Sequence, residues 1–129
     1  MVYTYEYDTD YLFGPAFPLV EIQLRPVGED KGISLQALVD SGADVTIVPW
    51  RYLQEAKVSC VGRAKMRWGS HTSKSYDVYL AVVDVGPHTV YGVRLLADKH
   101  NEEVILGRDV LNQIKITLNG PALVVEIEG

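Results

Sequence analysis

The sequence predicts an all-β protein, and three observations lead to this fold class. Val, Ile, Leu and Tyr recur in short alternating runs such as LVEIQL at residues 19–24 and VYLAVV at residues 78–83. Gly, Pro, Asp and Asn turns separate these runs, as expected between strands. The 129 residues are 47% hydrophobic and 22% charged, which is the balance of a single packed domain. Several short strands at this spacing favour a closed or sandwich-like β fold.

The elements can be placed along the chain from these patterns. Strands are predicted at residues 2–7, 19–24, 33–39, 45–48, 58–68, 78–83, 89–96, 103–106, 115–118 and 123–127. Residues 13–18, with the sequence FGPAFP, form a stiff turn into the next strand. Residues 49–56 are either a short helix with Pro49 near its first turn or a loop. Residues 108–114 predict a short amphipathic helix, because Val110, Leu111 and Ile114 share one face.

The composition excludes several classes of function. A formal charge of -5 without any Lys/Arg cluster disfavours nucleic acid as a partner. Cys60 is the only cysteine, so an intrachain disulfide is excluded, and we expect this thiol to be a small buried side chain. No apolar run reaches the roughly 20 residues of a membrane span, and the N-terminal sequence lacks the layout of a signal peptide. We therefore expect a soluble, cytoplasmic protein, unless the chain is part of a longer one.

The segment that carries chemistry is ALVDSGADVTIVP at residues 37–49. An apolar strand runs directly into an acid, a hydroxyl and a glycine, which holds Asp40 on a rigid element and lets Gly42 form the turn. Asp-Ser-Gly is also an ordinary turn tripeptide. The apolar flanks, the second acid at Asp44 and the distant ILGRD segment at residues 105–109 favour a functional loop instead.

These two segments resemble the signature blocks of the retropepsins, the homodimeric aspartic peptidases typified by retroviral proteases. Residues 38–44, LVDSGAD, match the block that carries the catalytic acid, and residues 105–111, ILGRDVL, match the second block. The resemblance covers the chain from about residue 18. It implies a closed β-barrel-like retropepsin fold, also called the acid protease fold, with one short C-terminal helix and a homodimeric assembly.

The resemblance also implies a function and a role for each residue. Asp40 and its copy in a second subunit would activate a water that hydrolyses a peptide bond in an extended polypeptide, without metal or other cofactor. Ser41 would brace the loop across the dimer axis, within an active-site loop that also contains Gly42 and Ala43. Asp44 would pair with Arg108 and lie near the substrate backbone. Residues 18–129 would be the peptidase domain.

Two further segments follow from the resemblance. Residues 66–74 lie where a β-hairpin flap covers the substrate, with Gly69 and Ser70 at its tip and Trp68 and His71 adding bulk beside it. Residues 1–17 form an N-terminal arm, which either joins the terminal strands at the dimer interface or has a separate function.

Other chemistries fit the sequence less well. Ser41 lacks the Gly-x-Ser-x-Gly setting of a serine hydrolase, and the three histidines lack the close spacing of metal ligands. The serious alternative is a non-catalytic dimeric module that keeps the retropepsin fold to bind peptides or to assemble. The intact Asp40-Ser41-Gly42 motif favours the peptidase.

Overall fold

A computed structural model describes residues 1–67 and 73–129 of the protein. Its described elements, in chain order, are β1 (Val2–Glu6), β2 (Leu19–Arg25), β3 (Ile33–Val39), β4 (Ile47–Pro49), α1 (Trp50–Ala56), β5 (Ser59–Met66), β6 (Lys74–Val85), β7 (His88–Asp98), β8 (Val104–Leu106), α2 (Arg108–Leu111), β9 (Ile116–Asn119) and β10 (Val124–Glu128). The all-β fold class predicted from the alternating runs is confirmed.

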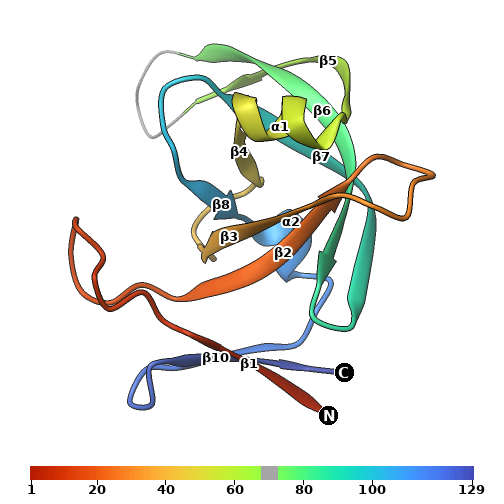
Figure 1. The fold of residues 1–129 in the computed structure, drawn as a ribbon. Helices are drawn as coiled ribbons and strands as arrows, with labels where there is room; N and C mark the ends of the chain where they lie inside the picture. Colours follow the sequence, from red (N-terminus) through yellow and green to blue (C-terminus); the bar gives the residue numbers. More distant parts are fainter. Residues whose placement is uncertain (68–72) are drawn as a thin grey trace.

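Six strands close into a barrel in the order β2, β3, β8, β4, β7 and β6 (Figure 1). The ring closes because β6 pairs with β2 as well as with β7, and β5 extends the sheet beyond β6. Most neighbours are antiparallel, but β8 runs parallel to β3, and β4 runs parallel to β7. Closure hides most strand edges, which is the usual solution for a small β protein.

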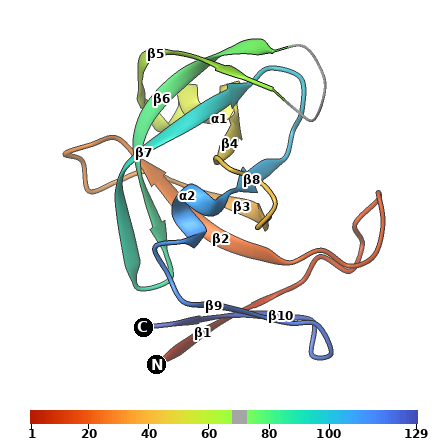
Figure 2. The same cartoon turned by 180° about the vertical axis from the view of Figure 1, so that it is seen from behind.

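A second sheet of β1, β10 and β9 lies below the barrel, where both termini come together (Figures 1 and 2). The first strand pairs with β10 of the same chain, and the amide of Gly129 donates to the carbonyl of Met1 at 2.9 Å. Val125 and Ile127 of β10 are fully buried in the main core, and Tyr5 of β1 packs against it. The terminal sheet is therefore part of the same packed unit as the barrel.

The core occupies the inside of the barrel, where alternate residues of each strand converge. In β2, Val20, Ile22 and Leu24 are buried, whereas the residues between them are at least partly exposed. The end of β3 differs, because Ala37, Leu38 and Val39 are all buried. Both sides of this strand are therefore covered just before the chain reaches Asp40.

The structure corrects several expectations from the sequence. The short C-terminal helix that the resemblance implied is present as α2, and of the two alternatives for residues 49–56 the structure has the helix, which ends at Lys57 in the left-handed conformation. The second helix is shorter than predicted and ends at Leu111, because the amides of Gln113 and Ile114 bond three residues back in a tighter turn. Cys60 is exposed on β5, not buried, because it lies on the outermost strand of the sheet.

Candidate active site

Asp40 is held at the end of β3 by the backbone bonds on both of its sides. The amide of Val39 donates to the carbonyl of Pro18 at 2.9 Å, and the amide of Asp40 donates to the carbonyl of Leu106 at 3.1 Å. The chain thus keeps its extended form through Asp40, between its two neighbouring strands. Asp40 itself is half-buried, so its carboxyl group is on a rigid element and still reachable.

The turn after Asp40 is organised around its carboxylate. The amide of Gly42 donates to Asp40 Oδ1 at 2.9 Å, and the amide of Ala43 donates to the Asp40 carbonyl at 3.1 Å. The sequence suggested that Gly42 was needed for its backbone freedom, but its φ is not positive. A Cβ at this position would instead lie 3.2 Å from Asp40 Oδ1, so the glycine leaves room for the carboxylate.

Arg108 ties the start of α2 to this loop. Its guanidinium donates to Asp44 Oδ1 and, at 3.2 Å, to the carbonyl of Ser41, while its amide donates to the carbonyl of Ala43 at 2.9 Å. The structure thus brings together four of the residues that the motifs singled out. Both charged side chains are largely exposed, so their role is to orient the loop and their ion pair adds little stability.

A buried polar cluster below the loop was missed by the sequence analysis. Thr46 is fully buried, and its hydroxyl donates to Asp109 Oδ1 at 2.6 Å while it accepts the amide of Gly107 at 3.0 Å. The amide of Thr46 also donates to Asp109 Oδ2 at 3.0 Å. One threonine therefore joins the loop to α2 and to the end of β8. The only signal in the sequence was a hydroxyl inside the apolar run VTIV.

Gly107 is required by the close approach of two segments. A Cβ there would lie 2.5 Å from the carbonyl carbon and oxygen of Val45 and 3.0 Å from the carbonyl oxygen of Ala43. These are backbone atoms, which cannot move aside as a flexible side chain can. The loop of residues 40–46 therefore wraps tightly around the end of β8 only because residue 107 has no side chain.

A row of apolar side chains crosses the outer side of the barrel wall next to Asp40. Directly paired residues of neighbouring strands share a face of the sheet. The register pairs, from β2 to β6, the residues of this apolar row: Leu19, Leu38, Ile105, Ile47, Leu96 and Val78. Alternate neighbours such as Val39, Leu106 and Leu95 belong to the main core, whereas Leu38, Leu96 and Val78 do not.

Asp40 lies on the same side as the apolar row, because it follows Leu38 by two residues in an extended chain. Ile47 is two strand spacings away from β3, which is about 10 Å at the usual distance between strands. The carboxylate of Asp40 therefore lies beside Leu38, the second member of this row. Leu19, Ile105 and Ile47 of the row are partly exposed, whereas Leu38, Leu96 and Val78 are buried.

The predicted flap and the predicted N-terminal arm have different outcomes. Trp68, Gly69, Ser70 and His71, assigned to the flap, lie outside the described residues. The arm of residues 1–17 forms β1 and a turn closed by the bridge between Asp8 and Phe17. Within residues 1–67 and 73–129, no three His, Cys, Asp or Glu side chains are grouped as metal ligands, and no helix is long and apolar enough to span a membrane.

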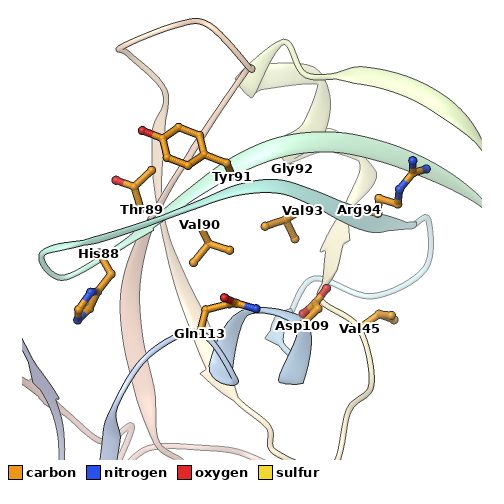
Figure 3. Close-up of a pocket in the computed structure, with 10 residues that line it drawn as sticks. All are labelled: Val45, His88, Thr89, Val90, Tyr91, Gly92, Val93, Arg94, Asp109 and Gln113. Atoms are coloured by element: carbon orange, nitrogen blue, oxygen red, sulfur yellow. The ribbon is translucent and has the colours of Figure 1, made fainter.

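A surface cavity of about 610 Å³ lies elsewhere, between β7 and α2 (Figure 3). Its two titratable groups of catalytic type are already engaged. His88 Nε2 donates to the carbonyl of Glu128 at 2.6 Å, and the Asp109 carboxylate accepts bonds from Thr46 and from the Val110 amide. The imidazole and the carboxylate that line this cavity are therefore both engaged, and Asp40 remains the better candidate for chemistry.

Comparison with known proteins gives one family match. Residues 29–113 match the family model described as gag-polyprotein putative aspartyl protease, a span that contains both signature blocks. A search of curated proteins finds no match.

Solved structures share the fold at low identity. A retropepsin-like aspartic protease from Rickettsia conorii is similar with a TM-score of 0.65 and 10% identity, over 98% of this chain and 90% of that one. The foamy viral protease-reverse transcriptase, solved with an RNA/DNA hybrid, is similar with a TM-score of 0.56 and 19% identity, over 77% of this chain. This chain spans only 12% of that viral protein's length. From the family match and the shared fold, the chain belongs to the retropepsin-like gag-polyprotein putative aspartyl protease family.

Proposed function

We propose that the protein is an aspartic endopeptidase, which hydrolyses peptide bonds in extended polypeptides with a water activated by two Asp40 side chains from two copies of the chain. The observation that carries this proposal is the placement of Asp40 beside Leu38, on the side of the sheet that carries the apolar row. Its loop is held by three separate contacts from Arg108 and by the buried hydroxyl of Thr46. These contacts fix the position of an exposed turn, as expected if the Asp40 carboxyl group must be positioned accurately for catalysis.

The chemistry needs two carboxyl groups. Two carboxylates about 3 Å apart cannot both be ionised, so they share one proton. The ionised member takes a proton from water, and the water oxygen attacks the carbonyl carbon of the substrate. The proton is then given to the leaving nitrogen as the C–N bond breaks. The two titrations belong to the pair and not to either residue alone.

A single chain supplies only one such motif, at residues 40–42. A second copy related by a two-fold axis would supply the other and would cover the same surface on both subunits. The exposure of Ser41 and Gly42 in the single chain supports this arrangement, because these residues are free to meet their own copies. The site is then complete only in the dimer.

The substrate class follows from the same surface. The partly exposed members of the apolar row, Leu19, Ile47 and Ile105, can contact alternate side chains of an extended segment. A folded protein would not fit this arrangement. We therefore expect the substrates to be unfolded or flexible polypeptide segments.

The test is cleavage of an unfolded protein between about pH 3 and pH 7, with and without a statine-type inhibitor. We expect inhibitor-sensitive cleavage, lost in Asp40→Asn and kept in the matched control Glu55→Gln, which changes an exposed acid on α1. Cleavage that survived in Asp40→Asn would contradict the mechanism. Absence of cleavage by the unmodified protein at every pH would favour the non-catalytic peptide-binding module.

A further inference from the structure

Lys74 begins β6 on the same side of the sheet as the apolar row. Residues two apart in a strand share a face, so Lys74 and Tyr76 lie on the side of Val78, which ends that row. Lys74 is exposed, and its partner across the hairpin is Met66 of β5. Lys74 therefore lies beyond Val78, at the β6 end of the apolar row, whereas Asp40 lies beside its second member, Leu38.

A cavity of about 450 Å³ opens beside this lysine, where β6 and β7 diverge. Ile47 and Leu96 of the apolar row line it, and the turn of residues 98–101 forms its other wall. The cavity is therefore continuous with the apolar row. A side chain of a peptide lying along that row can enter it.

The two acids of this cavity are already engaged. Asp98 accepts the amides of His100 and Asn101 at 2.9 and 3.2 Å and the Asn101 side-chain amide at 3.0 Å. Asp77 lies 3.7 Å from both Arg63 Nε and Lys99 Nζ. The Asp98 carboxylate therefore holds the turn, and the Asp77 carboxylate lies near Arg63 and Lys99.

Lys74 has no ion pair or hydrogen bond with any residue in the described part of the chain. Within residues 1–67 and 73–129 it is therefore an unpaired cation, in a protein of net charge -5 and beside a cavity whose acids are engaged. A carboxylate brought by a ligand would find an unpaired ammonium there. A basic side chain would find no free carboxylate among the residues that line the cavity.

We propose that Lys74 selects an acidic side chain of the substrate, Asp or Glu, at the position that enters this cavity. This inference rests on the proposed peptidase function and names the substrate feature that the site prefers. The ion pair forms at the surface, where such pairs have a modest effect. The expected preference for Glu over Gln at that position is roughly two- to five-fold in kcat/KM, and it should shrink as salt is added.

The experiment uses synthetic peptides of about ten residues with two apolar residues at the centre, as suits the apolar row. A single Glu is moved through the other positions, and each peptide is matched by one with Gln. We expect one position at which the Glu peptide is cleaved faster than its Gln partner. Lys74→Gln should remove this preference, and Lys74→Glu should reverse it, so that the Gln peptide is cleaved faster than the Glu peptide.

Lys65→Gln is the matched control. Lys65 is an exposed lysine of β5 that precedes Met66, so it lies on the opposite face of the hairpin from Lys74. The Lys65→Gln variant should keep the preference for the Glu peptide. The inference is overturned if Glu and Gln peptides are cleaved equally at every position, or if Lys65→Gln and Lys74→Gln lose the preference alike.

Peptide affinity for Asp40→Asn, measured by fluorescence anisotropy, separates this inference from the proposed function. Tighter binding of the Glu peptide that disappears in Asp40→Asn/Lys74→Gln supports the role of Lys74, even if no peptide is cleaved by the unmodified protein. Equal affinities in both proteins overturn it. Absence of cleavage alone contradicts the peptidase and leaves the binding result to decide the role of Lys74.

Discussion

Replacing Thr46 by valine tests whether the buried hydroxyl holds the Asp40 loop in place. Valine has nearly the same shape, so the change removes the hydroxyl and adds a methyl group. The lost contacts are the bond that the hydroxyl donates to Asp109 at 2.6 Å and the one it accepts from the Gly107 amide at 3.0 Å. The Gly107 amide is buried and would keep no partner.

The cost can be estimated from these two contacts. A bond to a charged group contributes about 1.5–3 kcal/mol, and a buried unpaired donor costs about 1–3 kcal/mol. These terms overlap, and the added methyl group returns about 0.8 kcal/mol. We expect Thr46→Val to lower the free energy of unfolding by about 2–4 kcal/mol. Thr46→Ser keeps the hydroxyl and loses one methyl group, so it should cost about 1 kcal/mol.

The assay is urea unfolding of both variants at one protein concentration, because stability depends on concentration if the chains associate. Thr46→Val should unfold at a clearly lower urea concentration than Thr46→Ser. If Thr46→Val proved as stable as Thr46→Ser, the hydroxyl would not be the link between the loop, α2 and β8.

Three further predictions follow from the same structure. Gly107→Ala should lower the free energy of unfolding by about 3 kcal/mol or more, because its methyl group would lie 2.5 Å from the Val45 carbonyl. A melting curve equal to that of the unmodified protein would contradict this prediction. Arg108→Lys should lower kcat/KM a few-fold without unfolding the chain, because lysine lacks the planar guanidinium that reaches both Asp44 and the Ser41 carbonyl. Unchanged kcat/KM with an unchanged circular dichroism spectrum would contradict this prediction. The hydrogen bond from Arg25 lowers the pKa of Asp84 from its ordinary 3.8, so this carboxylate contributes stability above about pH 4 that is lost as the pH falls through the lowered pKa. Urea unfolding against pH should therefore show a shallower acid decline for Asp84→Asn, and identical curves would contradict the role of the pair.

Much of the fold could be predicted because it depends on local patterns. Alternating apolar residues locate β2 and β3, and the LVDSGAD and ILGRDVL segments place Asp40 and Arg108. The family and the all-β closed barrel are confirmed. The dimer, the role of Asp40, the domain boundary at residue 17 and the cytoplasmic location stay predictions.

The features that the sequence did not reveal depend on contacts between distant segments. Thr46 and Asp109 are 63 residues apart, and no local pattern links a threonine in a strand with an acid in a helix. The apolar row appears only when the register of six strands is known, since Ile47 and Leu96 look like ordinary core residues. The sequence did not decide between a helix and a loop at residues 49–56, because Pro49 provides no side-chain cap. The end of this helix depends on the left-handed conformation of Lys57.

The central claim is that two copies of the chain share one catalytic site, with one Asp40 from each. A tandem protein tests this most directly, with two copies joined by a flexible Gly/Ser linker of about 20 residues and Asp40→Asn in only one copy. The isolated tandem monomer should lose more than about 100-fold in kcat relative to the tandem with both aspartates. Retention of about half the activity would mean that each chain carries an independent site, and the account would be wrong.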